Sequence, residues 1–213
     1  MPSVIPPSGF YYPNIIAHIY LEAMQKLIGA DAVTQVLREN GLDRYIGAFP
    51  PNNLQRQFDF ACFATLIAAL DEMAPLPGHR ESIAAEVGRL CFKGGNKAFG
   101  GLSGLGAISL GFQSLPMEVK VKNGLIAMAV TFTTLSDQHS DLEDHDDHFA
   151  YVIHRCPVCW GRQGSVPMCD TAGAMLDEGL YWATGAHFSI TETTCCGLGG
   201  ESCTFEILKT PRM

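Results

Sequence analysis

The chain has 213 residues, of which 47% are hydrophobic and 17% charged, and its formal net charge is −8. This length suits one domain with an ample apolar core, and the negative charge argues against a nucleic-acid-binding protein, which normally carries a basic face. Residues 1–13 lack the basic and apolar regions of a signal peptide, and no apolar run reaches the length of a membrane span. We therefore expect a cytoplasmic protein, in which the eight cysteines are reduced, metal-bound or buried rather than paired in disulfides.

The first two thirds of the sequence have the apolar spacing of helices. Residues 1–13 are rich in proline and aromatic residues, which predicts an extended arm that packs its aromatic residues on a neighbour. Apolar residues then recur at helical spacing after Pro13, and Gly29 is the expected end of this first helix. Further helices are predicted over residues 31–38, with Asp31 as the cap, over 55–73, from 81 onward and, as an angled pair, over 107–135.

Two segments in this region have both a chemical and a structural interpretation. Residues 94–111 contain seven glycines, which fit either a phosphate-binding loop or close helix packing and turns. Packing and turns are favoured, because no predicted strand precedes the segment and the Lys-Ser/Thr pair of a P-loop is absent.

Residues 137–148 are acidic and contain His139, His145 and His148, which could form a second metal site. A solvated loop is favoured there, because the spacing follows neither a helix nor a strand.

The last third of the sequence changes to extended segments. A β-branched and aromatic run over residues 149–156 predicts a strand, and a helix follows over 169–183 and ends at Gly185. Residues 187–193 and 202–208 predict two strands that pair across a glycine-rich turn. The fold class is therefore α+β, with a helical N-terminal layer packed on a small antiparallel sheet. We expect an arm over residues 1–13 and a single ligand-binding domain over 14–213, mostly helical over 14–135 and a strand–helix–hairpin with a metal site over 149–210.

The predicted hairpin brings a carboxylate and a cysteine to its buried side. Side chains alternate along a strand, so Glu192 belongs to the apolar face of the first strand and Cys203 to the apolar face of the second. An unpaired buried carboxylate is costly, so a cation or a basic residue is expected beside Glu192. Cys195 lies at the start of the turn, and Cys169 lies at a helix N-terminus, which favours a thiolate.

Three thiolates and one carboxylate form a four-coordinate set that suits zinc, and a set filled by the protein indicates a structural ion. The alternative is that the cysteines are free thiols and that the carboxylate pairs with a basic residue, such as Arg155 or Arg162. The predicted metal ligands are Cys169, Glu192, Cys195 and Cys203.

The pattern of Cys169, Glu192-x-x-Cys195 and Cys203, followed by Phe205 and Ile207, resembles the 4-vinyl reductase domain, and the resemblance covers roughly residues 83–208. That domain occurs in (bacterio)chlorophyll-biosynthesis proteins, in phenol-responsive transcription activators and in predicted hydrocarbon-binding proteins. In the phenol sensors the matching Cys, Glu, Cys and Cys bind zinc beside the effector pocket, so the resemblance implies zinc at these four residues. It also implies a fold like that of TRAPP subunits and haem-based nitric-oxide sensors, with an apolar tunnel and often a homodimer.

The chain departs from the sensor pattern in two respects. It lacks the ATPase and DNA-binding modules, so transcription activation is not implied. It also adds Cys156-Pro-Val-Cys159 and doubles Cys195 with Cys196. Cys156 and Cys159 could replace Glu192 as zinc ligands, help to hold an iron–sulfur cluster, or act as a thiol redox pair.

Three functions remain open on the sequence alone. The first is the binding of an apolar ligand, such as an aromatic compound, a fatty acyl chain or a tetrapyrrole. The second is an accessory or reductase role at the 8-vinyl group in (bacterio)chlorophyll synthesis, although the sequence has no NAD(P)H fingerprint and no identifiable catalytic residues. The third is a dimeric assembly subunit. We expect a homodimeric binding protein rather than an enzyme.

Overall fold

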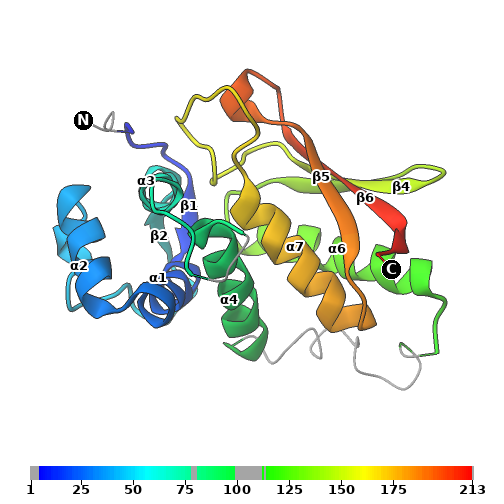
Figure 1. Ribbon diagram of the computed structural model, residues 1–213, viewed down its shortest axis with the longest axis horizontal. Coiled ribbons are helices and arrows are strands. Elements are labelled where there is room, and N and C mark those ends of the chain that lie inside the picture. Colours follow the sequence, from blue (N-terminus) through cyan, green and yellow to red (C-terminus); the bar gives the residue numbers. More distant parts are fainter. Residues whose placement is uncertain (1–4, 78–80, 99–111, 113, 213) are drawn as a thin grey trace.

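The computed structural model describes residues 5–77, 81–98, 112 and 114–212, and Figure 1 shows their arrangement. Of the glycine-rich segment predicted over 94–111, residues 94–98 form the end of a helix, and residues 99–111 lie outside the described residues, as does most of the first helix of the angled pair. The elements in chain order are β1 (Tyr11–Pro13), α1 (Asn14–Ile28), α2 (Ala30–Glu39), a short 3-10 turn (Asp43–Tyr45), β2 (Arg56–Asp59), α3 (Phe60–Asp71), α4 (Ile83–Ala98), α6 (Met117–Leu135), β3 (Ser140–Asp144), β4 (His148–Ile153), α7 (Asp170–Thr184), β5 (Phe188–Thr194), a second 3-10 turn (Cys196–Leu198) and β6 (Cys203–Pro211).

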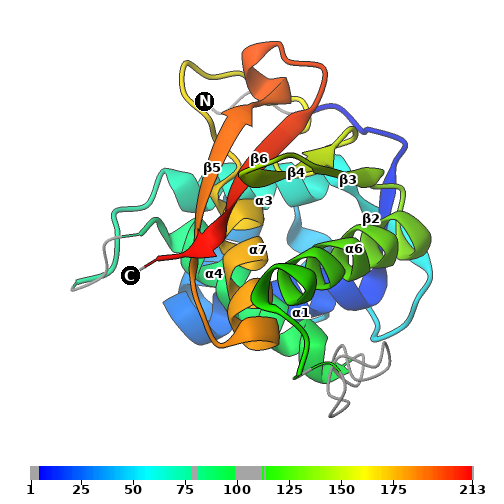
Figure 2. The same ribbon diagram turned by 90° about the vertical axis from the view of Figure 1, so that its right-hand side faces the viewer.

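The C-terminal half is a four-stranded antiparallel sheet with helices on one face, which confirms the predicted α+β class. The strand order is β3-β4-β6-β5. Helices α6 and α7 lie beneath this sheet in both views (Figures 1 and 2), and α4 connects α7 to α1 and to the N-terminal helices. One apolar core therefore runs from the sheet through α7 and α4 into the N-terminal part.

The N-terminal arm folds onto its own chain. β1 pairs with β2, and Tyr12 packs its ring against Phe60 and Phe63 at centroid distances of 5.0 and 5.1 Å. The aromatic residues of the arm thus contact the chain itself, where the sequence had suggested a neighbour. The paired strand β2 also replaces the first turn of the helix predicted over 55–73. That helix begins at Phe60, because the Asp59 carboxylate accepts the backbone N–H of Ala61 and caps it.

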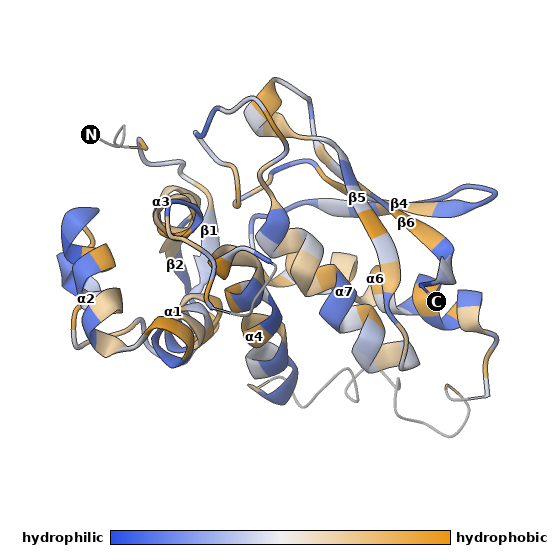
Figure 3. Cartoon of the chain, viewed as in Figure 1, coloured by the Kyte–Doolittle hydropathy of each residue, from blue (hydrophilic) through white to orange (hydrophobic). Residues whose placement is uncertain are grey.

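Two further boundaries differ from the prediction. Gly29 holds the N-cap position of α2, and Asp31 lies in the first turn of that helix. The acidic segment over 137–148 contains strand β3 and is therefore only partly a loop. β3 lies at the edge of the sheet and is mostly exposed, so it lacks the apolar alternation by which strands are recognised. The tip of the β3–β4 hairpin, beyond the label β4 in Figure 3, is hydrophilic. The helix over 169–183 and its end at Gly185, which has a left-handed conformation, are confirmed.

Candidate metal centre and ligand cavity

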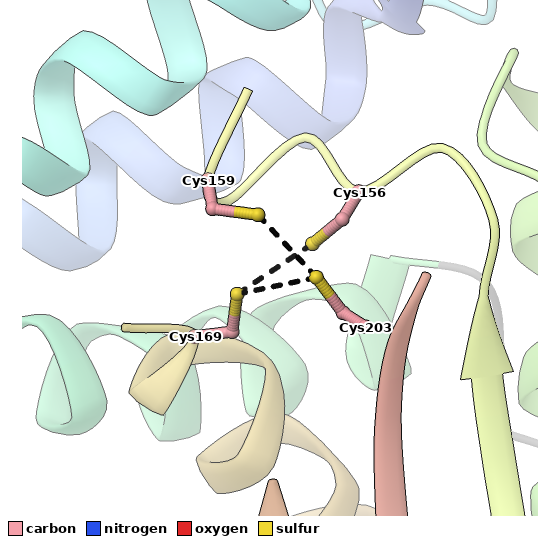
Figure 4. Close-up of side chains that lie close together, drawn as sticks. All are labelled: Cys156, Cys159, Cys169 and Cys203. Carbon is pink, nitrogen blue, oxygen red and sulfur yellow. Dashed lines mark hydrogen bonds between the residues drawn. The ribbon is translucent and has the colours of Figure 1, made fainter. Parts of the chain in front are cut away.

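The end of β4, the loop that follows it, the start of α7 and the start of β6 meet at one end of the sheet. β4 ends at Ile153, which pairs with Cys203, the first residue of β6. The loop after β4 carries Cys156 and Cys159 back over this point, and Cys169 lies at the N-cap position of α7. Figure 4 shows the four cysteine side chains pointing toward one another.

The sulfur atoms of these four cysteines are close enough to share one metal ion. The Cys156–Cys169 and Cys169–Cys203 sulfur distances are both 3.7 Å, and the Cys159–Cys203 distance is 3.3 Å. All four residues are buried. A zinc ion with Zn–S bonds of about 2.3 Å in a tetrahedron separates its sulfurs by about 3.8 Å, close to these values. A disulfide would need about 2.05 Å, so the cysteines are free thiols in this arrangement.

The set predicted from the hairpin is also brought together. Cys169, Glu192, Cys195 and Cys203 offer ligand atoms that all lie within 4.8 Å of one another. The Cys169–Cys195 sulfur distance is 3.9 Å, and the Glu192 Oε2 atom accepts the backbone N–H of Cys169 at 2.9 Å. The other carboxylate oxygen, Oε1, is buried without a hydrogen-bond partner.

No basic side chain meets this carboxylate among the described residues. Arg162 donates to Asp71 at 2.7 Å, and the Arg155 guanidinium lies 4.9 Å from the ring centre of Phe10. The alternative in which Glu192 pairs with one of these arginines is therefore wrong. A buried carboxylate oxygen without a partner is costly, so the position of Glu192 Oε1 is compatible with the predicted cation.

The proximity of the sulfurs also controls their protonation. Hydrogen bonds from neighbouring thiols, Cys156 first, hold the pKa of Cys159 below its ordinary value. The same interactions raise the pKa of Cys169 and Cys203, and burial raises that of Cys195 to about 11. Without a cation the cluster can therefore ionise only in part, because neighbouring thiolates repel one another. A divalent metal ion would remove this repulsion and hold several cysteines as thiolates.

The three histidines of the acidic segment do not converge. His145 and His148 stack near the tip of the β3–β4 hairpin with ring centres 4.6 Å apart, and His139 lies at its base. His139 instead stacks on His154, and Asp141 lies 2.9 Å from His154 and 3.9 Å from His139. The ligand atoms of these three groups lie within 4.8 Å of one another, but the side chains are largely exposed, and such exposed groups are common without a metal ion.

A cavity of about 340 Å³ lies between the helices and β4, beside the cysteines. This volume falls in the range of small-molecule pockets. Pro157 and Val158, which separate the first two cysteines, form part of its wall. The remaining lining comes from α1, α3, α4, α6, α7, β4 and the segments beside them: Tyr12, Ile16, Ile19, Phe63, Cys91, Phe92, Gly95, Asn96, Met128, Thr131, Phe132, Leu135, Gln138, Tyr151, Ile153, Ala172, Met175 and Leu176.

The cavity wall is apolar except for a few neutral hydrogen-bonding groups. The Tyr12 hydroxyl donates to Gln138 Oε1 at 2.5 Å, and the Gln138 amide donates to Ser140 at 2.8 Å. Among the described residues that line it there is no Lys, Arg, His, Asp or Glu. The sequence did not identify Tyr12 and Gln138 as binding residues, because they are 126 positions apart and belong to no local motif.

The comparisons with known proteins give a fold and one short sequence match. No family model matches the chain. A stretch of 59 residues is 30% identical to the bacteriochlorophyll synthase 23 kDa chain of Cereibacter sphaeroides, and it spans 28% of this chain and 29% of that protein. The chain is also similar in structure to the Fe(II) unliganded H-NOX protein from K. algicida, with a TM-score of 0.58 and 12% identity over 94% of this chain and 98% of that one.

A second solved structure agrees with this fold. The H-NOX protein from S. oneidensis in the Fe(II)NO ligation state matches with a TM-score of 0.56 and 12% identity, over 89% of this chain and 97% of that chain. The chain therefore has the fold of H-NOX proteins, which confirms the predicted NO-signalling type, while the TRAPP-like description finds no support. The 4-vinyl reductase resemblance, the zinc ion and the homodimer stay predictions. In the described residues, no helix combines the length and the apolar character that crossing a membrane requires.

Proposed function

We propose that this protein binds a small neutral aromatic or apolar molecule in the cavity between its helices, and that its cysteine cluster holds structural zinc. The observation that carries the proposal is an apolar cavity wall with neutral polar groups, lying directly against a buried set of side chains that could hold a metal ion. The H-NOX fold supports a ligand-binding domain.

The lining favours a neutral ligand over haem. Haem iron is usually held by His, by a Cys or Tyr anion or by Met with His, and the described lining has no histidine. Burial raises the pKa of Cys91 to about 12 and also raises those of Tyr12 and Tyr151, so these groups are neutral near pH 7. The described lining also offers no cationic side chain for the carboxylates of a haem or a fatty acid. The described lining residues therefore do not fit haem.

The size and polarity of the cavity narrow the ligand further. A cavity of about 150 Å³ holds one benzene, and this one measures about 340 Å³. Compounds with one or two rings would fit. The Tyr12 hydroxyl, which donates to Gln138, can still accept one hydrogen bond. A neutral hydroxyl on the ligand would be a suitable donor, so we take phenols as the favoured class.

Calorimetric titration of the whole protein with 4-methylphenol and with 4-methylbenzoate tests this proposal. The phenol should bind, and the benzoate should bind at least about 10-fold more weakly, because its charge would be buried without a partner. Thr131 in α6 lines the cavity, so Thr131→Phe should fill it and abolish binding. Thr134→Phe on the exposed face of the same helix is the matched control and should bind as the wild type does. Equal binding of the two compounds, or undiminished binding by Thr131→Phe, would refute the proposal.

The sulfur spacing favours zinc over an iron–sulfur cluster. In such a cluster each iron has its own terminal cysteine or cysteines, so sulfurs bound to different irons lie further apart than one tetrahedral edge. The sulfur–sulfur distances of 3.3 to 3.9 Å between neighbouring cysteines are close to the edge length of a tetrahedron of thiolates around one zinc ion. Metal analysis and the visible spectrum of anaerobically purified protein distinguish the two, since a brown protein that contains sulfide would rule out zinc.

A second candidate function is an accessory role in bacteriochlorophyll synthesis. The 59-residue match to the bacteriochlorophyll synthase chain favours it. Incubation with divinyl chlorophyllide and a reductant tests this role directly. Reduction of the vinyl group would establish an enzyme, and binding without turnover would indicate a pigment carrier.

A further inference from the structure

We propose that the cysteine cluster holds two divalent metal ions, which share the thiolates of Cys169 and Cys203 as bridging ligands. This inference rests on the proposed metal centre and adds a second ion to it. Six donor side chains form two overlapping sets of four that share Cys169 and Cys203. The first set is Cys156, Cys159, Cys169 and Cys203, and the second is Cys169, Glu192, Cys195 and Cys203.

Two tetrahedra that share one edge need six donors, and these two sets supply six. The shared edge joins the sulfurs of Cys169 and Cys203, which are 3.7 Å apart, close to the tetrahedral edge of about 3.8 Å. Each bridging sulfur is also near a terminal sulfur of the first set, Cys156 at 3.7 Å from Cys169 and Cys159 at 3.3 Å from Cys203. Cys195, from the second set, lies 3.9 Å from Cys169.

The terminal ligands come from different parts of the fold. Cys156 and Cys159 belong to the loop after β4, whereas Glu192 belongs to β5 and Cys195 follows its last residue. The bridging pair lies at the N-cap of α7 and the start of β6. Figure 4 shows the loop cysteines beside this pair, and the ligand atoms of Glu192 and Cys195 lie within 4.8 Å of it. The arrangement therefore provides one ion position on the loop and one on the hairpin.

A single ion would leave part of this site without a partner. If it took the four cysteines of the first set, the buried Oε1 atom of Glu192 would stay without a partner, and Cys195 would remain a buried thiol beside the ion. If it took the second set, Cys156 and Cys159 would remain as buried thiols next to a metal ion. Two divalent ions satisfy all six donors. They also balance most of the charge, because five thiolates and one carboxylate carry six negative charges against four positive ones.

The test is the metal stoichiometry of the whole chain. Metal-free, fully reduced protein is titrated anaerobically with Co²⁺, and native mass spectrometry counts the ions bound. We expect two per chain. The thiolate-to-cobalt absorption should rise up to two equivalents, and the electron paramagnetic resonance signal per cobalt should fall as the second ion enters, because bridging thiolates couple the two spins.

Variants assign the two positions. Cys156→Ser with Cys159→Ser should bind one ion, as should Glu192→Gln with Cys195→Ser. Cys196→Ser is the matched control, since this cysteine belongs to neither set, and it should bind two. If a double variant does not fold, the wild-type stoichiometry and spin coupling still decide.

Three results would overturn the inference in distinguishable ways. One ion per folded chain would leave the single-zinc centre standing and remove only the second ion. Two uncoupled ions would place the second ion elsewhere. No tightly bound metal would remove both the inference and the proposed zinc, whereas phenol binding tests the cavity separately.

Discussion

Gly88 in α4 lies against the backbone of α7, so an alanine at this position should loosen the helix pair that positions Cys169. A Cβ atom on Gly88 would lie 2.6 Å from the backbone oxygen of Thr171, closer than the 3.0 Å below which some atom must shift. Thr171 follows Cys169 by two residues, and its hydroxyl donates to the backbone oxygen of Ala84 in α4 at 3.1 Å. A backbone oxygen cannot rotate away, so the two helices would have to separate by at least about 0.4 Å.

The size of the effect follows from two opposing terms. Replacing glycine by alanine inside a helix gains about 1 kcal/mol of helix propensity. Overpacking a tight contact costs about 1–3 kcal/mol, and a backbone contact belongs at the upper end of that range. We therefore expect Gly88→Ala to lower the free energy of unfolding by about 1–2 kcal/mol and the melting temperature by about 2–8 °C.

Gly124→Ala in α6 is the matched control. Its Cβ atom would lie 3.7 Å from Ala183 and 3.8 Å from Leu180, which are ordinary contact distances. This variant should gain about 0.5–1 kcal/mol through helix propensity alone. Urea unfolding followed by circular dichroism measures both variants, with zinc at a fixed concentration. A Gly88→Ala protein that is as stable as Gly124→Ala would refute the close contact between α4 and α7.

Four further predictions concern the core and the metal. Arg89→Met should cost about 3 kcal/mol, because it leaves the buried Asp177 with only His187, and Arg89→Met combined with Asp177→Leu should cost less in the same urea assay. Burial acts to raise the pKa of Asp177, but hydrogen bonds from Arg89 and His187 outweigh it and hold the pKa below its ordinary value. This contribution is therefore present above about pH 4 and lost as the pH falls, so Asp177→Asn should flatten the acid limb of a stability–pH curve. Cys91→Ser should lose about 1–3 kcal/mol by burying an unpaired hydroxyl, whereas Cys91→Val should stay near the wild type in thermal melts. Zinc removal by a chelator under reducing conditions should lower the melting temperature, and re-added zinc should restore it; an unchanged calorimetric melt would rule out a structural ion.

The fold was predictable where the residue pattern is strong. The first helix and its end at Gly29, the helix before Gly185 and the C-terminal hairpin all follow from apolar spacing and glycine positions. Strands β2 and β3 were missed for a physical reason. β2 has four residues and continues directly into α3, and β3 is an exposed acidic edge strand, so neither has the alternation that marks a half-buried strand.

The sequence by itself determined that Glu192 and Cys203 lie on the buried side of one hairpin, because side chains alternate with a fixed period along a strand. Only the tertiary structure decided that Cys156 and Cys159 reach the same place, since a loop has no period from which its side-chain directions follow. The cavity likewise depends on packing. Tyr12 and Gln138 meet across 126 positions, and such a contact depends on how the helices pack against the sheet rather than on any local pattern.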